Sequence, residues 1–273
     1  MNTAHNHNRR AWDDRVRRGD AYTDTATARQ IDNATEVMDD DGWIGRDAAG
    51  KRVLCLAAGG GKQSAVFAAA GALVTVVDIS PKMLDLDRRV AVERKLKIRI
   101  VEGSMADLSM LEEGGFDFVV QPVSTCYVPD IERVYRQVAR VLVAGGLYIS
   151  QHKQPVNLQA DVLPSRRGYL LNEPYYRAGP LPPAPADAAH RESGTLEFLH
   201  RWEQLLGGLC RSGFVIEDVA EPKHADPQAN PGSFAHRSCF VPPYIKIKAR
   251  RTDGVLARSP ERKLWLPQAK QSS

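Results

Sequence analysis

The hydrophobic residues that follow Lys51 fall into short continuous runs separated by stretches with helical spacing. A continuous apolar run is typical of a strand that is covered on both faces of a parallel sheet. We expect strands over residues 53–57, 73–78, 97–101, 116–121 and 146–151, and helices over residues 62–70, from Pro81, and over residues 130–142. Strands that alternate with helices build parallel sheets through crossover connections, so this pattern predicts an α/β, doubly wound, Rossmann-like sheet.

Local signals mark the ends of two of these helices. Ser80 can cap the helix that begins at Pro81, because serine accepts a hydrogen bond at the N-cap and proline suits the first turn. Gly145 and Gly146 are expected to end the helix over residues 130–142, since glycine readily adopts the left-handed conformation that stops a helix.

The regions on either side of this alternation have a different pattern. Apolar side chains in the first fifty residues are spaced as in helices, which predicts an N-terminal helical cover over residues 1–50. Residues 155–192 contain seven prolines and are expected to form an irregular inserted lid that selects the substrate. A helix over residues 194–211 is expected to follow this lid.

The end of the chain predicts an antiparallel hairpin. A strand over residues 214–219 and an alternating strand from Tyr244 are expected to be joined without a helix. A purely parallel dinucleotide-binding fold would not end in this way. The main domain is therefore expected to cover residues 51–250, and residues 251–273 are expected to form a flexible tail.

Composition and charge narrow the class of protein. The chain has 273 residues, of which 43% are hydrophobic, enough for one sizeable core. Its net charge of +4 gives no indication of a nucleic-acid-binding face. The four cysteines are scattered without a Cys-x-x-Cys pair, so we expect neither a metal site nor a disulfide framework and favour a cytoplasmic location.

The sequence also gives no reason to expect a membrane partner. The N-terminus mixes arginine and aspartate with no apolar stretch behind them, unlike a secretory signal. The longest apolar stretch, residues 65–77, is interrupted by Gly71 and Thr75 and is too short to span a bilayer. No feature of the sequence specifies an oligomeric state.

A glycine turn directly after the first strand is the main candidate for a cofactor site. Gly59 to Gly61 would let a ligand approach the backbone, and Asp78 at the end of the second strand could accept hydrogen bonds from a ribose. A phosphate-binding P-loop would need a hydroxyl residue where Gln63 stands, and a dinucleotide fingerprint would need glycine in place of Ser64. A turn for S-adenosylmethionine (SAM) is compatible with these residues.

Five segments together resemble the class I SAM-dependent methyltransferases, in particular a subgroup whose first motif reads Cys-Leu-Ala-Ala-Gly-Gly-Gly. The segments are residues 51–61, 74–84, 101–108, 116–124 and the stretch from Val128 to Gly146, and the resemblance covers about residues 8 to 250. The resemblance implies a seven-stranded sheet of order 3-2-1-4-5-7-6 with strand 7 antiparallel, which also accounts for the terminal hairpin. It implies SAM as the cofactor and a small molecule as the methyl acceptor.

The resemblance also implies roles for individual residues. Ala57, Ala58, Gly59, Gly60 and Gly61 would wrap the methionine end of SAM, and Asp78 would hold both ribose hydroxyls. Ile79, Ser104 and Met105 would lie around the adenine, whereas Gln121, Pro122 and Val123 would lie beside the sulfonium. The N-terminal residues that would close over the cofactor are Trp12, Arg15, Tyr22 and Thr23.

Two positions depart from the family pattern. Cys55 replaces an acidic residue that many members carry on the first strand, so the ammonium group of SAM would need backbone carbonyls or water. Ser104 replaces an acidic residue that often contacts the adenine, which implies either a weaker contact or one that Asp107 supplies.

Methyl transfer from a sulfonium is a direct displacement, so the protein mainly aligns the reactants and excludes water. A general base is needed only if the acceptor must lose a proton. His152, just after the fifth strand, is the candidate by position, and a polar residue at a strand end is the simpler interpretation. Further residues that could reach the same mouth are His224, Asp226, His236 and Arg237, and those that could line the lid are Tyr175, Tyr176 and Arg177.

Two other functions stay open on the sequence alone. The fold could be a catalytically silent SAM-binding module, which the Cys55 and Ser104 departures would favour. A nicotinamide-dependent oxidoreductase is disfavoured by Ser64 and by the terminal hairpin.

Overall fold

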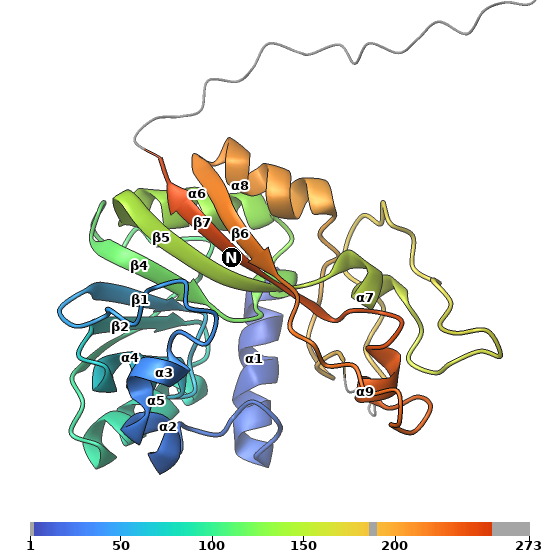
Figure 1. Cartoon of the computed structure of the whole chain (residues 1–273), viewed down its shortest axis with the longest axis horizontal. Coiled ribbons are helices and arrows are strands. Elements are labelled where there is room, and N and C mark those ends of the chain that lie inside the picture. The colour runs from blue at the N-terminus through green and yellow to red at the C-terminus, as the bar shows by residue number, and fades with distance from the viewer. Residues whose placement is uncertain (1–2, 186–189, 253–273) are drawn as a thin grey trace, which may run out of the picture.

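The computed structural model describes residues 3–185 and 190–252 (Figure 1). Seven strands form one sheet of order β3-β2-β1-β4-β5-β7-β6, which confirms the expected topology. The strands are β1 (Arg52–Leu56), β2 (Leu73–Asp78), β3 (Ile98–Glu102), β4 (Phe116–Gln121), β5 (Leu142–Lys153), β6 (Phe214–Ala220) and β7 (Tyr244–Arg251). The helices are α1 (Thr3–Arg18), α2 (Ala28–Asp32), α3 (Ala34–Val37), α4 (Gln63–Ala69), α5 (Pro81–Glu93), η1 (Thr125–Tyr127), α6 (Ile131–Val141), α7 (Pro155–Gln159), η2 (Glu203–Gly207), α8 (Gly208–Arg211) and α9 (Phe234–Arg237).

Strand pairing brings the carboxyl ends of the parallel strands and the start of β7 to the same side of the sheet. The pairs from β3 through β5 are parallel, so these strands end at the same edge. Strand β7 runs antiparallel between β5 and β6, and its first residue, Tyr244, pairs with Lys153 at the end of β5. The start of β7 therefore lies beside the end of β5, where ligands bind in open α/β sheets.

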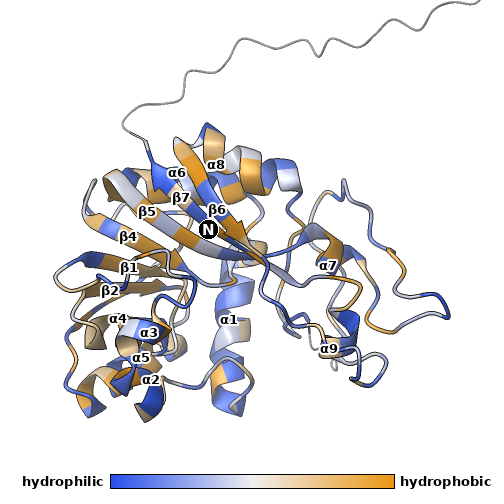
Figure 2. Ribbon diagram, viewed as in Figure 1, coloured by the Kyte–Doolittle hydropathy of each residue, from blue (hydrophilic) through white to orange (hydrophobic). Residues whose placement is uncertain are grey.

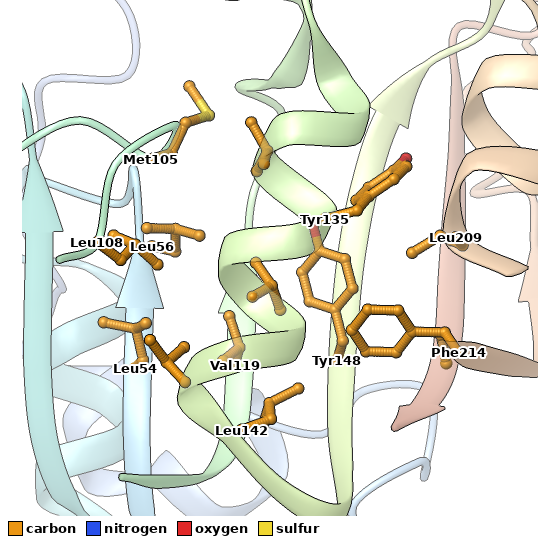
Figure 3. Close-up of a cluster of buried hydrophobic side chains, with 14 of the residues drawn as sticks. Leu54, Leu56, Met105, Leu108, Val119, Tyr135, Leu142, Tyr148, Leu209 and Phe214 are labelled. Atoms are coloured by element: carbon orange, nitrogen blue, oxygen red, sulfur yellow. The ribbon is translucent and has the colours of Figure 1, made fainter. Parts of the chain in front are cut away.

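Apolar side chains fill both faces of the sheet. On one face, Leu54 and Leu56 belong to a cluster with α6 and α8, in which Tyr148 packs against Phe214 with ring centroids 5.7 Å apart (Figure 3). On the other face, Val53 and Cys55 pack with residues of α4 and α5. Helix α1 is mainly hydrophilic, whereas the buried strands carry hydrophobic stretches (Figure 2). The core thus anchors β1, β4 and β5 rigidly beneath the site.

The first fifty residues contain the expected helices, and α1 is fixed by one buried amide. Asn8 donates from Nδ2 to the backbone oxygens of Tyr127 and Leu196, each at 3.0 Å, and its Oδ1 accepts from the Leu196 nitrogen at 2.7 Å. Helix α1 therefore joins the segment after β4 to the segment after the insertion.

Three expected elements differ in the structure. Helix α6 ends at Val141, and both predicted stop glycines lie within β5, where the β4–β5 register shifts. A Cβ on Gly146 would lie 2.9 Å from the Val143 oxygen and 3.1 Å from the Asp117 oxygen, so close packing of the strand requires this glycine. The connection between β6 and β7 includes the short helix α9, so the hairpin is not free of helix as expected.

The helix predicted over residues 194–211 is shorter, because tertiary hydrogen bonds hold its first part in an irregular conformation. The nitrogen of Phe198 donates to the oxygen of Cys126 at 2.7 Å, and the oxygen of Glu197 accepts from the Leu181 nitrogen at 2.7 Å. Residues 197–200 are all buried, whereas a surface helix buries only one face. The helical turns begin only near Trp202.

The described residues of the insertion after β5, 155–185 and 190–192, are irregular apart from α7, as expected from the prolines. Arg237 of α9 holds this region in place. Its guanidinium donates to the backbone oxygens of Asn157, Ala160 and Asp161 at 3.0, 2.9 and 2.8 Å, and to the side chain of Asn157. Figure 1 shows α7 and α9 together beyond one end of the sheet. Of the tail predicted over residues 251–273, Arg251 instead belongs to β7, because it continues the strand pairing, and residues 253–273 lie outside the described residues.

Candidate active site

A cavity of about 740 Å³ opens at the carboxyl ends of the parallel strands. Its size falls within the range of about 300–1,000 Å³ that is usual for small-molecule sites. The walls come from four regions. These are the turns after β1, β2, β3 and β4, the N-terminal segment, Glu192, and the β6–β7 connection with the start of β7. The lining residues include Trp12, Tyr22, Ala57, Ala58, Gly59, Gly60, Asp78, Ile79, Met83, Met105, Pro122, Val123, Ser124, Tyr127, Gln151, Glu192, His224, Phe234 and Tyr244.

The glycine turn after β1 is held by two carboxylates. Asp78 Oδ2 accepts from the Gly59 nitrogen at 2.9 Å, and Asp87 Oδ2 accepts from the Gly60 nitrogen at 2.9 Å. Gly60 has φ +120°, and a Cβ at this position would lie 2.9 Å from Met83 Cε. Only glycine therefore suits the turn at this point, and its backbone faces the cavity directly.

Burial changes the ionisation of both carboxylates. It raises the pKa of Asp78 to about 6, although backbone hydrogen bonds from Ser80 and Gly59 oppose the shift. Burial likewise raises the pKa of Asp87 to about 6, against a hydrogen bond from Ser64. Both groups are mostly ionised at neutral pH and become protonated under mildly acidic conditions.

Most of the residues expected to bind the cofactor lie along this cavity. Ala57, Ala58, Gly59, Gly60, Asp78, Ile79, Met105 and Pro122 line it, whereas Gly61, Ser104 and Gln121 are not among the lining residues. The oxygen of Gly61 accepts from the Ala26 nitrogen at 3.1 Å, and Ser104 Oγ accepts from the Ala106 nitrogen at 3.2 Å. Gln121 is buried beneath the cavity, where its Oε1 accepts from the Tyr148 hydroxyl at 2.6 Å.

His152, expected just beyond a strand, lies inside β5 and is fully buried. Its Nδ1 lies 2.8 Å from Thr125 Oγ1 and its Nε2 lies 2.7 Å from Ser150 Oγ, so both ring nitrogens have partners. Burial, with a smaller effect of His200, lowers the pKa of His152 to about 3. Because it does not line the cavity, its position gives no support to a role as general base.

The end of the cavity away from the glycine turn is aromatic and carries one buried carboxylate. His224, Phe234 and Tyr244 all line it, with ring centroids 5.4 to 6.3 Å apart. Glu192 lies opposite the cofactor residues and accepts from the Tyr127 hydroxyl at 2.8 Å and from Lys153 Nζ at 2.6 Å. This end therefore combines flat apolar surfaces with a negative group.

The N-terminal segment forms part of the wall, as expected. Trp12 and Tyr22 line the cavity, and Trp12 packs edge-on against Tyr127 at 5.8 Å. Arg15 and Thr23 lie behind it. Arg15 donates to the Ala21 oxygen at 3.3 Å, and Thr23 Oγ1 donates to the Asp20 oxygen at 2.6 Å, so both shape the turn that presents Tyr22.

Of the other residues predicted to reach the site from the β6–β7 connection and the insertion, some line the cavity and others do not. His224 lines the cavity, whereas His236, Arg237 and Asp226 do not. His236 and Arg237 instead contact the insertion, where the Tyr169 hydroxyl lies 2.9 Å from His236 Nδ1, and the Asp226 nitrogen donates to the Ala235 oxygen within the loop at 3.1 Å. Tyr175, Tyr176 and Arg177 are likewise absent from the lining, and the Tyr175 hydroxyl accepts from the Trp202 nitrogen at 3.1 Å.

Asp87, Glu192 and Phe234 were not predicted as site residues. Asp87 could have been found, because it is a carboxylate on the apolar face of a helix that otherwise presents Leu84 and Val90 to the core. Glu192 and Phe234 reach the cavity only through the fold of the insertion and the β6–β7 connection. Within the described ranges no three His, Cys, Asp or Glu side chains gather as a metal site, and no helix there is long and apolar enough to cross a bilayer.

Comparison with known proteins identifies the family. Residues 54–150 match a methyltransferase domain family. The chain is 35% identical over 236 residues to the uncharacterized methyltransferase YbaJ of Bacillus subtilis, covering 82% of this chain and 92% of that protein. This chain belongs to the class I SAM-dependent methyltransferases.

Two further comparisons bear on this methyltransferase. It resembles the crystal structure of a SAM-dependent methyltransferase from Mesorhizobium loti with a TM-score of 0.64 and 25% identity, covering 81% of this chain and all of that one. A ubiquinone biosynthesis O-methyltransferase of Xanthomonas oryzae is 35% identical over 105 residues, which is 38% of this chain and 44% of that enzyme. The second likeness is therefore partial. SAM is the cofactor of this methyltransferase.

The residues at the glycine turn fit SAM. Gly59 and Gly60 leave the turn without side chains, so a ligand can contact the backbone. Asp78 lines the cavity, and its two oxygens accept backbone hydrogen bonds from Ser80 and Gly59 without filling all the lone pairs of the carboxylate, so it can also accept from a ribose. Cys55, where many members carry an acid, is fully buried and is not among the lining residues.

Proposed function

We propose that this methyltransferase holds SAM at the glycine-turn end of the cavity and transfers its methyl group to a small molecule held at the aromatic end. The single observation that carries this proposal is that one cavity combines the turn, Asp78 and the aromatic end. In this arrangement the two ligands would meet near Pro122 and Val123, which follow β4.

The proposed cofactor contacts use the backbone and one carboxylate. Ala57, Ala58, Gly59 and Gly60 would face the methionine end, Asp78 would accept from the ribose hydroxyls, and Ile79 and Met105 would pack against the adenine. SAM supplies an electrophilic methyl group on a sulfonium. The protein then aligns the acceptor with that methyl group and keeps water out, which is the main requirement for a direct displacement.

A small acceptor suits the enclosure of the site. The N-terminal segment, Glu192 and the β6–β7 connection all border the cavity, so a ligand there is walled on several sides. The partial relatives are named as O-methyltransferases of ubiquinone biosynthesis, which supports a small-molecule acceptor. We also propose that the insertion over residues 155–192 acts as the lid, since its end contributes Glu192 to the wall.

Calorimetry with S-adenosylhomocysteine (SAH), the demethylated product, tests the cofactor half of this proposal. We expect the wild-type protein to bind SAH and not NAD, and Asp78→Ala to weaken SAH binding at least about tenfold through loss of charged hydrogen bonds. Asp85→Ala is the matched control, because Asp85 is an exposed carboxylate on α5, the helix that follows Asp78, and is not among the cavity-lining residues. No SAH binding at millimolar ligand, or equal binding by Asp78→Ala, would reject the proposed site.

A further inference from the structure

Glu192 presents one unused carboxylate oxygen at the cavity wall. The residue is only 8% exposed, and its hydrogen bonds from Tyr127 and Lys153 both go to Oε2. No other described side chain donates a hydrogen bond to its Oε1. Because Glu192 lines the cavity and Tyr127 and Lys153 occupy only Oε2, Oε1 is the carboxylate oxygen left to accept a hydrogen bond from a ligand there.

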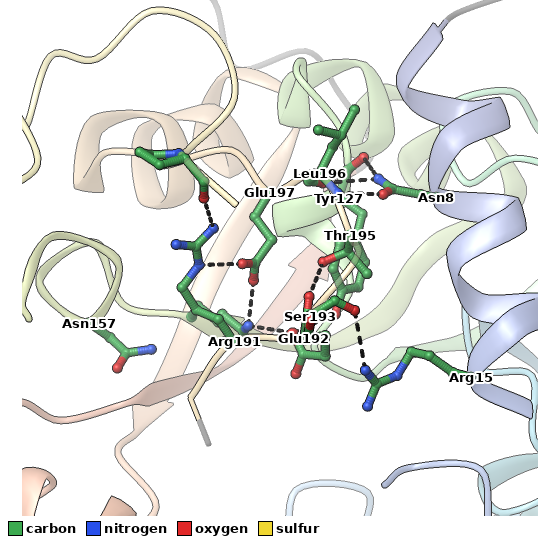
Figure 4. A network of polar contacts seen from close by, with 12 residues as sticks. Asn8, Arg15, Tyr127, Asn157, Arg191, Glu192, Ser193, Thr195, Leu196 and Glu197 are labelled. Atoms are coloured by element: carbon green, nitrogen blue, oxygen red, sulfur yellow. Dashed lines mark hydrogen bonds and ion pairs between the residues drawn. The ribbon is translucent and has the colours of Figure 1, made fainter. Parts of the chain in front are cut away.

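The charge of Glu192 is maintained by a buried network (Figure 4). Burial alone would raise the pKa of Glu192, but the adjacent Lys153 ammonium and the hydrogen bonds from Lys153 and Tyr127 lower it below the usual value. Lys153 also donates to Glu197 Oε1 at 2.5 Å, and Arg191 donates to Glu197. Two acidic and two basic groups thus balance, and Glu192 is the member of this network that lines the cavity.

A wall of three rings accompanies this carboxylate. The ring wall consists of His224, Phe234 and Tyr244, and each pair of rings lies within 6.3 Å between centroids. Tyr127 and Trp12, packed edge-on, also line the cavity. Aromatic surfaces of this kind favour a flat ring, which can stack on them or meet them edge-on.

Resting on the proposed function, we infer that Glu192 and the ring wall form the acceptor site and that the acceptor is a planar aromatic molecule with a hydroxyl or amino hydrogen-bond donor. The donor binds Oε1 of Glu192, and the ring packs against Phe234 and Tyr244. A carboxylate or phosphate beside the ring would be repelled by Glu192. Hydroxyl and amino groups can both donate a hydrogen bond to Oε1, so the two kinds of donor must be distinguished by their measured affinities.

Four small probes test this inference on the SAH-saturated, full-length protein by ligand-observed NMR. Catechol and 2-aminophenol have both a ring and donors, 1,2-dimethoxybenzene has the ring without donors, and 1,2-cyclohexanediol has donors without an aromatic ring. We expect the first two to bind at least about tenfold more tightly than the last two. Tighter binding of catechol than of 2-aminophenol indicates a hydroxyl donor at Oε1 of Glu192, and the reverse order indicates an amino donor.

Two substitutions connect this binding to the proposed residues. Glu192→Gln keeps an oxygen for Tyr127 and Lys153 but replaces the open oxygen by an amide nitrogen, which cannot accept. We expect this substitution to weaken the binding of catechol and 2-aminophenol at least about tenfold and to leave the affinity for SAH unchanged. Glu203→Gln is the control, because Glu203 is exposed. Phe234→Leu should weaken the binding of the three aromatic probes, while thermal unfolding should show that the fold is retained.

The outcomes separate this inference from the proposed function. Failure to bind SAH at all would reject the proposed function itself. Normal SAH binding would instead reject the inference alone if none of the four probes bound at millimolar concentration, if 1,2-cyclohexanediol or 1,2-dimethoxybenzene bound as well as catechol, or if Glu192→Gln bound catechol like the wild type.

Discussion

At the scale of single residues, the site depends on two buried carboxylates beneath a glycine turn. Asp78 and Asp87 each accept a backbone hydrogen bond from the turn, and burial raises the pKa of both to about 6. A raised pKa means that the folded protein favours the protonated carboxyl group over the ionised one. The stability that this preference contributes is fully present below the unfolded pKa and is lost as the pH rises through about 6, so ionisation of Asp78 costs stability in the free protein. The two carboxylates are retained in the ionised form despite this cost, which is consistent with a role in binding.

Cofactor affinity should therefore depend on pH near the value for Asp78. A carboxylate accepts hydrogen bonds from both ribose hydroxyls, whereas the protonated form has lost part of that capacity. With a pKa of about 6 for Asp78, we expect SAH affinity to fall about tenfold between pH 7.5 and pH 5. Calorimetry across this range measures the effect, and Asp78→Ala should flatten it. A profile that is flat in the wild type would contradict the role of Asp78.

The conformation of the turn gives a second prediction at this scale. Gly60→Ala places a side chain at φ +120°, a backbone conformation that strains alanine, and its Cβ 2.9 Å from Met83 Cε also displaces that flexible side chain, which lines the cavity. Gly179→Ala is the matched control, because Gly179 also has a positive φ, of +88°, but open space around its Cβ. We expect both variants to lose about 1 kcal/mol or more in free energy of unfolding, and only Gly60→Ala to lose SAH binding. Equal SAH binding by the two variants would show that the turn is not at the cofactor.

At the scale of elements, two long segments complete the cavity that the sheet begins. The insertion brings Glu192 and the β6–β7 connection brings His224 and Phe234. Arg237 joins these segments through four hydrogen bonds to oxygens of the insertion, and burial lowers its pKa to about 10. None of these bonds goes to a carboxylate, so they position the segments without cancelling a charge.

Arg237 should therefore control the order of the insertion rather than that of the sheet. Arg237→Met would leave four buried oxygens without a donor. We expect hydrogen exchange of amides around α7 to speed up at least about tenfold, while amides of β1, β4 and β5 stay protected. Arg167→Met in the same insertion is a control, since Arg167 is exposed. Uniform loss of protection across the sheet would instead assign Arg237 to the global core.

The Lys153 network gives a second element-scale prediction, because it ties the end of β5 to residues 192–197. Lys153→Met leaves Glu192 and Glu197 buried beside a methyl group, and breaking such a network typically costs about 3–5 kcal/mol. Urea unfolding measures this loss. Lys248→Met is the control, as Lys248 pairs with Glu217 nearer the surface and should lose less than about 1 kcal/mol.

The sequence predicted the elements whose signal is local and missed those decided by distant contacts. The runs over β1 to β4 and the cap at Ser80 are present as expected, and the Ser80 side chain accepts from the Met83 nitrogen. In contrast, the helix expected from residue 194 is replaced by an irregular segment, because Asn8 and Cys126 bind its backbone. His152 was assigned to a strand end because the length of β5 depends on pairing with β7, which the local pattern does not reveal.

The same distinction holds for the site. The glycine turn and Asp78 are close in sequence to the strands that position them, so their place could be read from the pattern. Glu192, Phe234 and Tyr244 come from three separate segments and meet only in the folded chain. Only Asp87 carried a local signal that was overlooked, as a buried acid on an apolar helix face.

At the scale of the whole molecule, the cavity couples parts of the chain that are far apart in sequence. Its walls come from α1 and the following turn, the segments after β1, β2, β3 and β4, Glu192 and the β6–β7 connection. A ligand that contacts all of them should stabilise the molecule as a unit. By mass action, SAH at about one hundred times its Kd adds about 2.7 kcal/mol, or roughly 5–10 °C in Tm for a protein of this size.

Thermal unfolding with and without SAH tests this coupling, and hydrogen exchange shows where protection is gained. We expect slower exchange in the turn after β1 and also in the segment that contains Trp12 and Tyr22. NAD at the same concentration is the control and should leave Tm unchanged. Protection restricted to the turn after β1 would show that the N-terminal segment does not close over the cofactor.

A crystal structure of the SAH complex tests the central claim most directly. We expect the ribose hydroxyls within hydrogen-bond distance of Asp78, the amino-acid end of SAH against Gly59 and Gly60, and its sulfur facing the aromatic end near Pro122. SAH bound elsewhere, or bound here with the ribose away from Asp78, would contradict the proposed site.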